Sequence, residues 1–80
     1  MDEKKYVVVF DFATNVHEDM SDFILELGVQ PHLGMNIFLD DKLIEFPEDL
    51  ETDGYFNIEE LDYLVSDDVF VATLKNQFKF

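Results

Sequence analysis

The chain contains no cysteine and no arginine, and only five lysines stand against 19 Asp and Glu residues. Without cysteine there is no disulfide framework, no thiolate metal site and no cysteine nucleophile, and this favours a cytoplasmic location. Its three glycines are scattered, so no loop can cradle a phosphate, and neither of its two serines lies in a Gly-x-Ser-x-Gly motif. We therefore expect a binding protein and no enzyme.

The net charge of −14 limits the partners. Proteins that bind nucleic acid directly neutralise phosphates with Lys and Arg, and anionic membranes attract the same residues. Both kinds of surface would be repelled here. The N-terminal residues also fit neither a signal peptide nor a membrane span. Basic proteins and cations are the partners that the charge favours.

A packed core is expected despite this charge. The composition is 48% hydrophobic and includes nine Phe, well above what a disordered chain carries. A chain of 80 residues has room for one core. We predict a single acidic domain over residues 1–80.

Hydrophobic spacing predicts strands at both ends of the chain and two helices between them. Residues 6–12 are β-branched and aromatic, and residues 69–80 alternate between apolar and polar, with a possible fold-back at Lys75-Asn76. Asn15 and Asn57 are each followed three residues later by Glu, a variant of the capping box, and apolar residues then recur at helical spacing. The first predicted helix ends at Gly28.

Two short apolar segments, 35–39 and 42–46, flank Asp40-Asp41 and predict a hairpin. The element order is then β-α-β-β-α-β. The simplest closed arrangement is an α+β, ferredoxin-like fold, a four-stranded antiparallel sheet with two helices on one face. The Phe-rich C-terminal strand would lie at an edge and could pair with a second copy in a homodimer.

Residues 49–60, DLETDGYFNIEE, resemble the calcium loop of the EF-hand family, with Gly54 at the sharp turn. The pattern departs from the family at its third position, which is Glu, and at Pro47, where the incoming helix should end. The resemblance implies a calcium-binding module as the alternative function. Its ligands would be Asp49, Glu51, Asp53, the carbonyl of Tyr55, Asn57 and Glu60. The competing interpretation is a helix cap that needs no metal.

Asp11 closes the first predicted strand. In a ferredoxin-like domain this placement distantly resembles a family of small CRISPR-associated nucleases, and the resemblance implies metal-dependent cleavage of a phosphodiester. It covers only residues 6–12, and the acidic field opposes a polyanionic substrate. The alternative is that Asp11 caps a turn.

The acidic residues form two groups. Glu18, Asp22 and Glu26 would form one row along the first helix, with Asp19 beside them, at a spacing similar in scale to successive phosphates. The second group lies in the hairpin turn and the loop that follows it: Asp40, Asp41, Glu48, Asp49, Glu51 and Asp53. A small domain needs a net charge of only about 2–8 for solubility, so the excess favours a use in binding.

We therefore expect an acidic protein that mimics nucleic acid and occupies the basic groove of a partner, such as a defence nuclease, a restriction enzyme, a CRISPR effector or a nuclease toxin. In size and charge the chain resembles phage anti-defence inhibitors, anti-CRISPR proteins among them, and immunity proteins. It carries no family motif that would name the partner.

Overall fold

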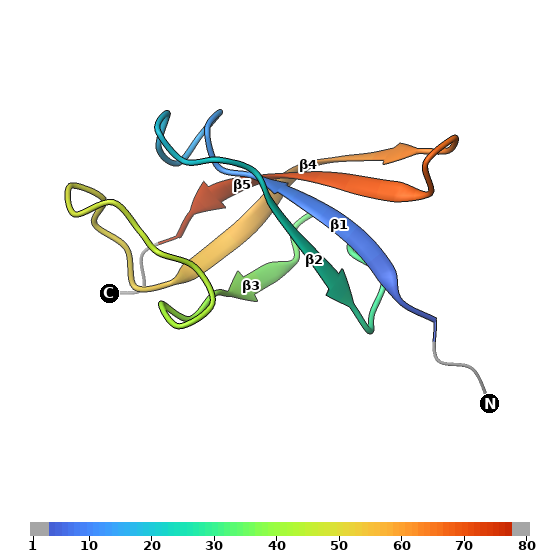
Figure 1. Cartoon of the computed structure of the whole chain (residues 1–80), viewed down its shortest axis with the longest axis horizontal. Coiled ribbons are helices and arrows are strands. Elements are labelled where there is room, and N and C mark those ends of the chain that lie inside the picture. The colour runs from blue at the N-terminus through green and yellow to red at the C-terminus, as the bar shows by residue number, and fades with distance from the viewer. Residues whose placement is uncertain (1–3, 78–80) are drawn as a thin grey trace.

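The computed structural model describes residues 4–77, and in these residues the chain forms strands and no helix. Five strands make one curled, mixed sheet in the order β2-β1-β5-β4-β3 (Figure 1). The strands are β1 (Tyr6–Asp11), β2 (Phe23–Leu27), β3 (Asn36–Phe38), β4 (Tyr55–Leu64) and β5 (Val69–Asn76). The predicted α+β, ferredoxin-like fold is therefore wrong. No helix within residues 4–77 has the length and apolarity needed to cross a membrane.

Both terminal strands occur where the sequence predicts them. β1 pairs with β2 in antiparallel fashion and with β5 in parallel fashion, and β4 runs antiparallel to both β5 and β3. β5 thus lies in the middle of the sheet, and the predicted free edge along this strand is wrong. The end of the predicted C-terminal strand, 78–80, lies outside the described residues.

The first predicted helix is replaced by a loop, 12–22, and the edge strand β2. Phe23, Leu25 and Leu27 are half-buried while Ile24 and Glu26 are exposed, so the segment alternates with a period of two. Apolar residues this close together satisfy a helical and an extended pattern equally. Residues 23–27 form a strand and not a helix because they pair with the apolar strand β1.

The second predicted helix is wrong because β4 contains a bulge. Phe56 and Ile58 alternate as buried residues, and a register shift between Ile58 and Glu60 inserts one extra residue. Leu61 consequently packs against the same core as Ile58, three residues before it. A spacing of three between apolar residues imitates a helix when a bulge lies between them.

The predicted hairpin is also wrong in its second half. β3 pairs with β4 through Asn36, Ile37 and Phe38, and residues 42–46 form no strand. Instead the carbonyl of Asp40 accepts the N–H of Leu43 at 2.9 Å. The chain turns here and enters a long loop, 39–54.

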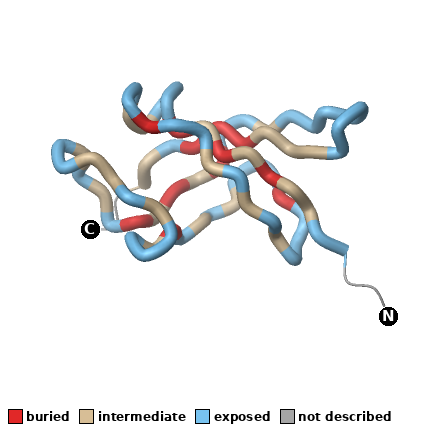
Figure 2. The backbone as a smooth tube through the Cα atoms, viewed as in Figure 1, coloured by how far each residue is buried: buried red, intermediate tan, exposed pale blue. Residues whose placement is uncertain are grey.

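One face of the curled sheet carries the core. The buried residues of this core come from the three central strands, β1, β5 and β4, and from the adjoining loops (Figure 2). Phe12 and Phe56 meet edge to face, with their ring centroids 5.5 Å apart. The core consists of Val8, Phe10, Phe12, Met20, Leu39, Phe56, Ile58, Ala72 and Leu74. Loop 12–22 and loop 39–54 therefore pack onto this face through Met20 and Leu39.

Candidate functional site

Loop 12–22 and loop 39–54 meet at one end of the sheet, where they are joined by their side chains. His17 Nε2 lies 2.9 Å from Asp49 Oδ1. The imidazole is 14% exposed and the carboxylate 78% exposed. Within loop 12–22, the N–H groups of Val16 and His17 both donate to the carbonyl of Phe12, which folds the loop tightly. The position of His17, and with it the contact between the loops, follows from this turn.

The ends of loop 39–54 are fixed to each other. The N–H of Leu39 donates to the carbonyl of Gly54 at 2.8 Å. Gly54 has φ +90°, and a Cβ there would lie 2.9 Å from Phe38 Cε1 and 3.0 Å from the Leu39 carbonyl oxygen. Only glycine fits this position without strain. Thr52 attaches the loop to β5, because its hydroxyl donates to Asn76 Oδ1 at 2.8 Å.

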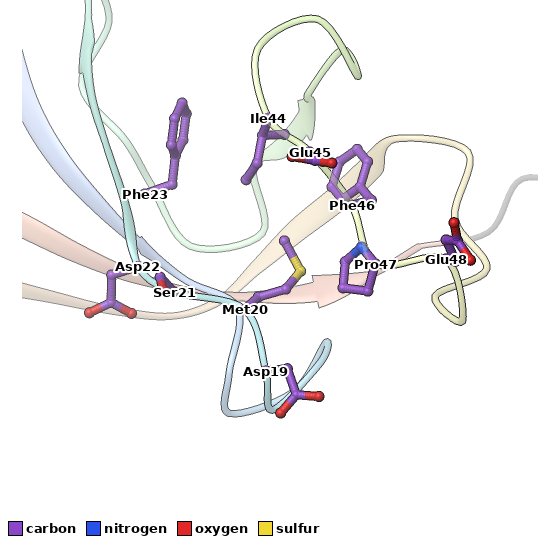
Figure 3. A pocket seen from close by; sticks show the side chains of 10 residues that line it. All are labelled: Asp19, Met20, Ser21, Asp22, Phe23, Ile44, Glu45, Phe46, Pro47 and Glu48. Carbon is purple, nitrogen blue, oxygen red and sulfur yellow. The ribbon is translucent and has the colours of Figure 1, made fainter.

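Three adjoining grooves surround the two loops. The first, the Met20 groove, encloses about 510 Å³ between Met20 and Phe23 on one side and Ile44 to Glu48 on the other (Figure 3). The second, the Asp41 groove, encloses about 570 Å³ within loop 39–54 and shares Glu45 and Phe46 with the first. The third, the His17 groove, encloses about 600 Å³ along loop 12–22 and shares Asp19 with the first. The grooves thus form one continuous surface.

Nine carboxylates line these grooves, and we name this set the acidic face. They are Glu18, Asp19, Asp22, Asp40, Asp41, Glu45, Glu48, Asp49 and Asp53. Eight of them are among the ten residues that the sequence predicts for partner binding. The other two, Glu26 on β2 and Glu51, line none of the three grooves. Sequence reasoning missed Glu45, which lies in the same acid-rich segment.

The helical row of Glu18, Asp22 and Glu26 does not form. Glu18 and Asp22 lie in loop 12–22, whereas Glu26 lies in β2 opposite Val7. The approach of loop 39–54 gathers the carboxylates instead. The spacing of residues along one predicted helix holds no information on the contact between loop 12–22 and loop 39–54.

The acidic face receives little positive charge from the described chain. Among residues 4–77, no lysine lines any of its three grooves. His17 lines the third groove and contacts the Asp49 carboxylate through Nε2, and because its Nδ1 accepts the N–H of Asp19, this contact is a hydrogen bond from a neutral imidazole. The pKa of Asp41 is raised because it shares a hydrogen bond with Asp40 and lies beside that charge. The acidic face is therefore a region of mutual repulsion that a cation would relieve.

The residues of the predicted calcium loop are divided between the end of loop 39–54 and the strand β4. Tyr55, Asn57 and Glu60 belong to β4, so the helix that follows an EF-hand loop is absent, and the helix-cap interpretation is wrong as well. The Asn57 amide donates to the Gly34 carbonyl at 2.8 Å, and the Tyr55 carbonyl accepts the N–H of Gln77 at 2.9 Å. Residues 4–77 contain no group of three or more His, Asp or Glu side chains that could hold a metal ion. The calcium hypothesis stays a prediction.

Asp11 caps a turn. Its carboxylate accepts the Thr14 hydroxyl at 2.6 Å and the Thr14 N–H at 3.3 Å. The ferredoxin-like fold on which the nuclease resemblance depends is absent. These two observations remove the structural basis for the nuclease interpretation.

No protein-family model matches this chain, and neither a curated protein nor a solved structure matches it.

Proposed function

We propose that the protein binds a basic surface of a partner protein through its acidic face and thereby competes with nucleic acid for that surface. The partner is a nucleic-acid-binding enzyme, such as a defence nuclease or a nuclease toxin, whose groove accepts phosphates. Binding blocks the groove and inhibits the enzyme. The action is stoichiometric and includes no catalytic step. It takes place in the cytoplasm, in keeping with a chain that has no cysteine.

The observation that carries this proposal is the gathering of nine carboxylates, from two separate loops, around three grooves; within the part of the chain that the structure describes, no lysine lines these grooves. Folding brings these charges together and costs stability. A cationic partner offsets that cost when the two surfaces meet. Complementary charge also steers the encounter, since opposite potentials raise association rates at low salt.

The test is a competition between the protein and DNA for a basic probe. A fluorescent DNA duplex is bound to protamine, an arginine-rich DNA-binding protein, and the release of DNA is followed by anisotropy as this protein is added. We expect the wild-type chain to release the DNA. The variant Asp22→Lys/Glu48→Lys, altered on the acidic face, should require at least about tenfold more protein, because two charge pairs are reversed.

The matched control is Asp62→Lys/Asp67→Lys. Both of these residues are exposed and lie outside the acidic face, and the double substitution changes the net charge equally. This control should release DNA nearly as well as the wild type. Equal losses in both variants would mean that net charge alone acts, and that the acidic face has no special part in binding.

A further inference from the structure

The Met20 groove combines an apolar floor with a charged border. Figure 3 shows Met20, Ile44 and Phe46 around a common space, with the Phe23 ring at its edge beside Ile44; Asp19 and Asp22 lie at its border with their carboxylates turned outward, and Glu48 lies beyond Pro47. Met20 is 8% exposed. The rings of Phe23 and Phe46 come from different segments, β2 and loop 39–54. The groove is thus formed only when the loops meet.

A purely apolar occupant does not suit this groove. It would lie beside the acidic residues that line the groove, Asp19, Asp22, Glu45 and Glu48, and displace water near them without offering a partner. Withdrawing an ionised carboxylate from water without compensation costs several kcal/mol. A small hydrated cation suits it equally poorly, because such an ion makes no use of Met20 and the two aromatic rings. The occupant must be both cationic and apolar.

Arginine meets both requirements better than lysine. Its guanidinium is planar and weakly hydrated, stacks on aromatic faces and pairs with a carboxylate through two parallel hydrogen bonds. Its aliphatic stem covers apolar surface. The lysine ammonium is a compact, strongly hydrated charge that gains less from an aromatic floor. Two phenylalanine rings beside four carboxylates therefore favour a guanidinium.

We infer that the Met20 groove is an arginine-recognition site, which takes an arginine side chain from the basic surface of the partner. This inference rests on the proposed function and deepens it, since it names the group that the acidic face selects. The arginine stem lies on Met20, its guanidinium stacks on Phe23 or Phe46, and carboxylates at the border of the groove accept its N–H groups. Arginine is also the cation most enriched at the energetic centres of protein interfaces.

The experiment compares two synthetic peptides of equal length and charge, one alternating Arg with Gly and the other Lys with Gly. Their affinities for the full chain are measured by fluorescence anisotropy at one fixed salt concentration. We expect the arginine peptide to bind about two- to fivefold more tightly, the range that one aromatic–cation contact at a partly exposed site supplies. In Phe23→Leu and in Phe46→Leu this preference should disappear, with thermal melts to confirm that each variant folds.

Tyr63→Leu is the matched control, because Tyr63 is an aromatic residue that is 47% exposed and lies outside the groove. This variant should keep the preference for arginine. Equal binding of both peptides to the wild type would overturn the arginine inference and leave the proposed function standing. A preference that survives in both Phe variants would overturn the assignment to this groove. Failure of both peptides to bind would overturn the proposed function as well.

Discussion

His17 and Asp49, which are 32 residues apart in the chain, are joined at 2.9 Å and hold loop 12–22 against loop 39–54. The His17 side chain also accepts the N–H of Asp19 at 3.2 Å through Nδ1, so the ring is held at both nitrogens. Both loops contribute walls to the Met20 groove. This contact therefore adds to the core packing of Met20 and Leu39 in fixing the shape of the acidic face.

Replacing His17 by alanine should loosen the two loops. We expect the free energy of unfolding to fall by about 1 kcal/mol, the usual contribution of a hydrogen bond, because the substitution removes the donor to Asp49. Urea denaturation measures this change. Affinity for the arginine peptide should fall with it. The same substitution at His32, an exposed residue, is the control and should change neither quantity. Unaltered stability and affinity in His17→Ala would contradict a role in joining the loops.

Gly54→Ala should destabilise the protein by about 2 kcal/mol or more, because it combines a positive φ with close contacts. The new Cβ would lie 3.0 Å from the Leu39 carbonyl oxygen, a backbone atom that cannot easily move. Gly28→Ala is the control, since a Cβ there meets nothing within 4 Å. Thermal melts compare the two variants. Equal melting temperatures would show that the strain assigned to Gly54 is absent.

The sequence singled out Gly54 for a different reason from the one the fold provides. The EF-hand resemblance gives this glycine a place in a calcium loop, whereas the structure requires it for a close approach to Phe38. The same holds for Asn57 and Glu60, which imitate a helix cap and belong to a bulged strand. The terminal strands could be predicted because residues 6–12 form a continuous β-branched and aromatic run and residues 69–80 alternate between apolar and polar. The middle of the chain could not, because its spacing fits two secondary structures and only pairing across the sheet decides between them.

Most of the acidic face could nevertheless be predicted. Carboxylates stay exposed whatever the fold, so their density along residues 18–22 and 40–53 already marks two charged segments. These segments meet through His17 and Asp49 and through the buried side chains of Met20 and Leu39, and no local sequence pattern predicts this contact. The aromatic floor of the Met20 groove was missed for the same reason. Phe23 and Phe46 are brought together only by the folded chain.

Raising the salt concentration should stabilise the protein. The Debye length falls from about 30 Å at 0.01 M salt to about 8 Å at physiological ionic strength, so repulsion within the acidic face weakens. We expect the free energy of unfolding to rise by on the order of 1 kcal/mol, the size of one close charge pair in water. Urea denaturation at the two salt concentrations measures it. A fall in stability with salt would show that attraction, not repulsion, dominates the surface.

Calcium and magnesium at matched ionic strength provide the control for this salt effect. Both should raise the melting temperature equally, because the described residues bring no three His, Asp or Glu side chains together to hold an ion. A rise specific to calcium, lost in Asp53→Asn, would support the calcium hypothesis instead.

Asp40 and Asp41 should titrate in opposite directions from their usual values. The Lys42 N–H, 2.9 Å from Asp40 Oδ1, is the main cause that lowers the pKa of Asp40, and the hydrogen bond with Asp40 raises the pKa of Asp41. Asp41 thus contributes stability below its usual pKa that is lost as the pH rises through the raised pKa. Asp40 contributes stability above its usual pKa that is lost as the pH falls through the lowered one.

Asp40→Asn tests this pairing by removing the neighbouring charge. We expect the pKa of Asp41 to move down toward its usual value, as measured by carboxyl-carbon NMR during a pH titration. Asp67→Asn, on the distant β4–β5 turn, should leave the titration of Asp41 unchanged. If Asp41 titrates identically in wild type and Asp40→Asn, the two carboxylates do not interact.

The most direct measurement of the central claim is the location of binding. Amide NMR spectra of the full chain are recorded while the arginine peptide is added at physiological salt. We predict that the largest shifts fall in residues 12–23 and 39–54, with only small changes at Glu59, Glu60, Asp62, Asp67 and Asp68, which are equally exposed carboxylates elsewhere. Shifts of similar size at all exposed carboxylates would contradict the account, because the protein would then attract cations through its net charge alone.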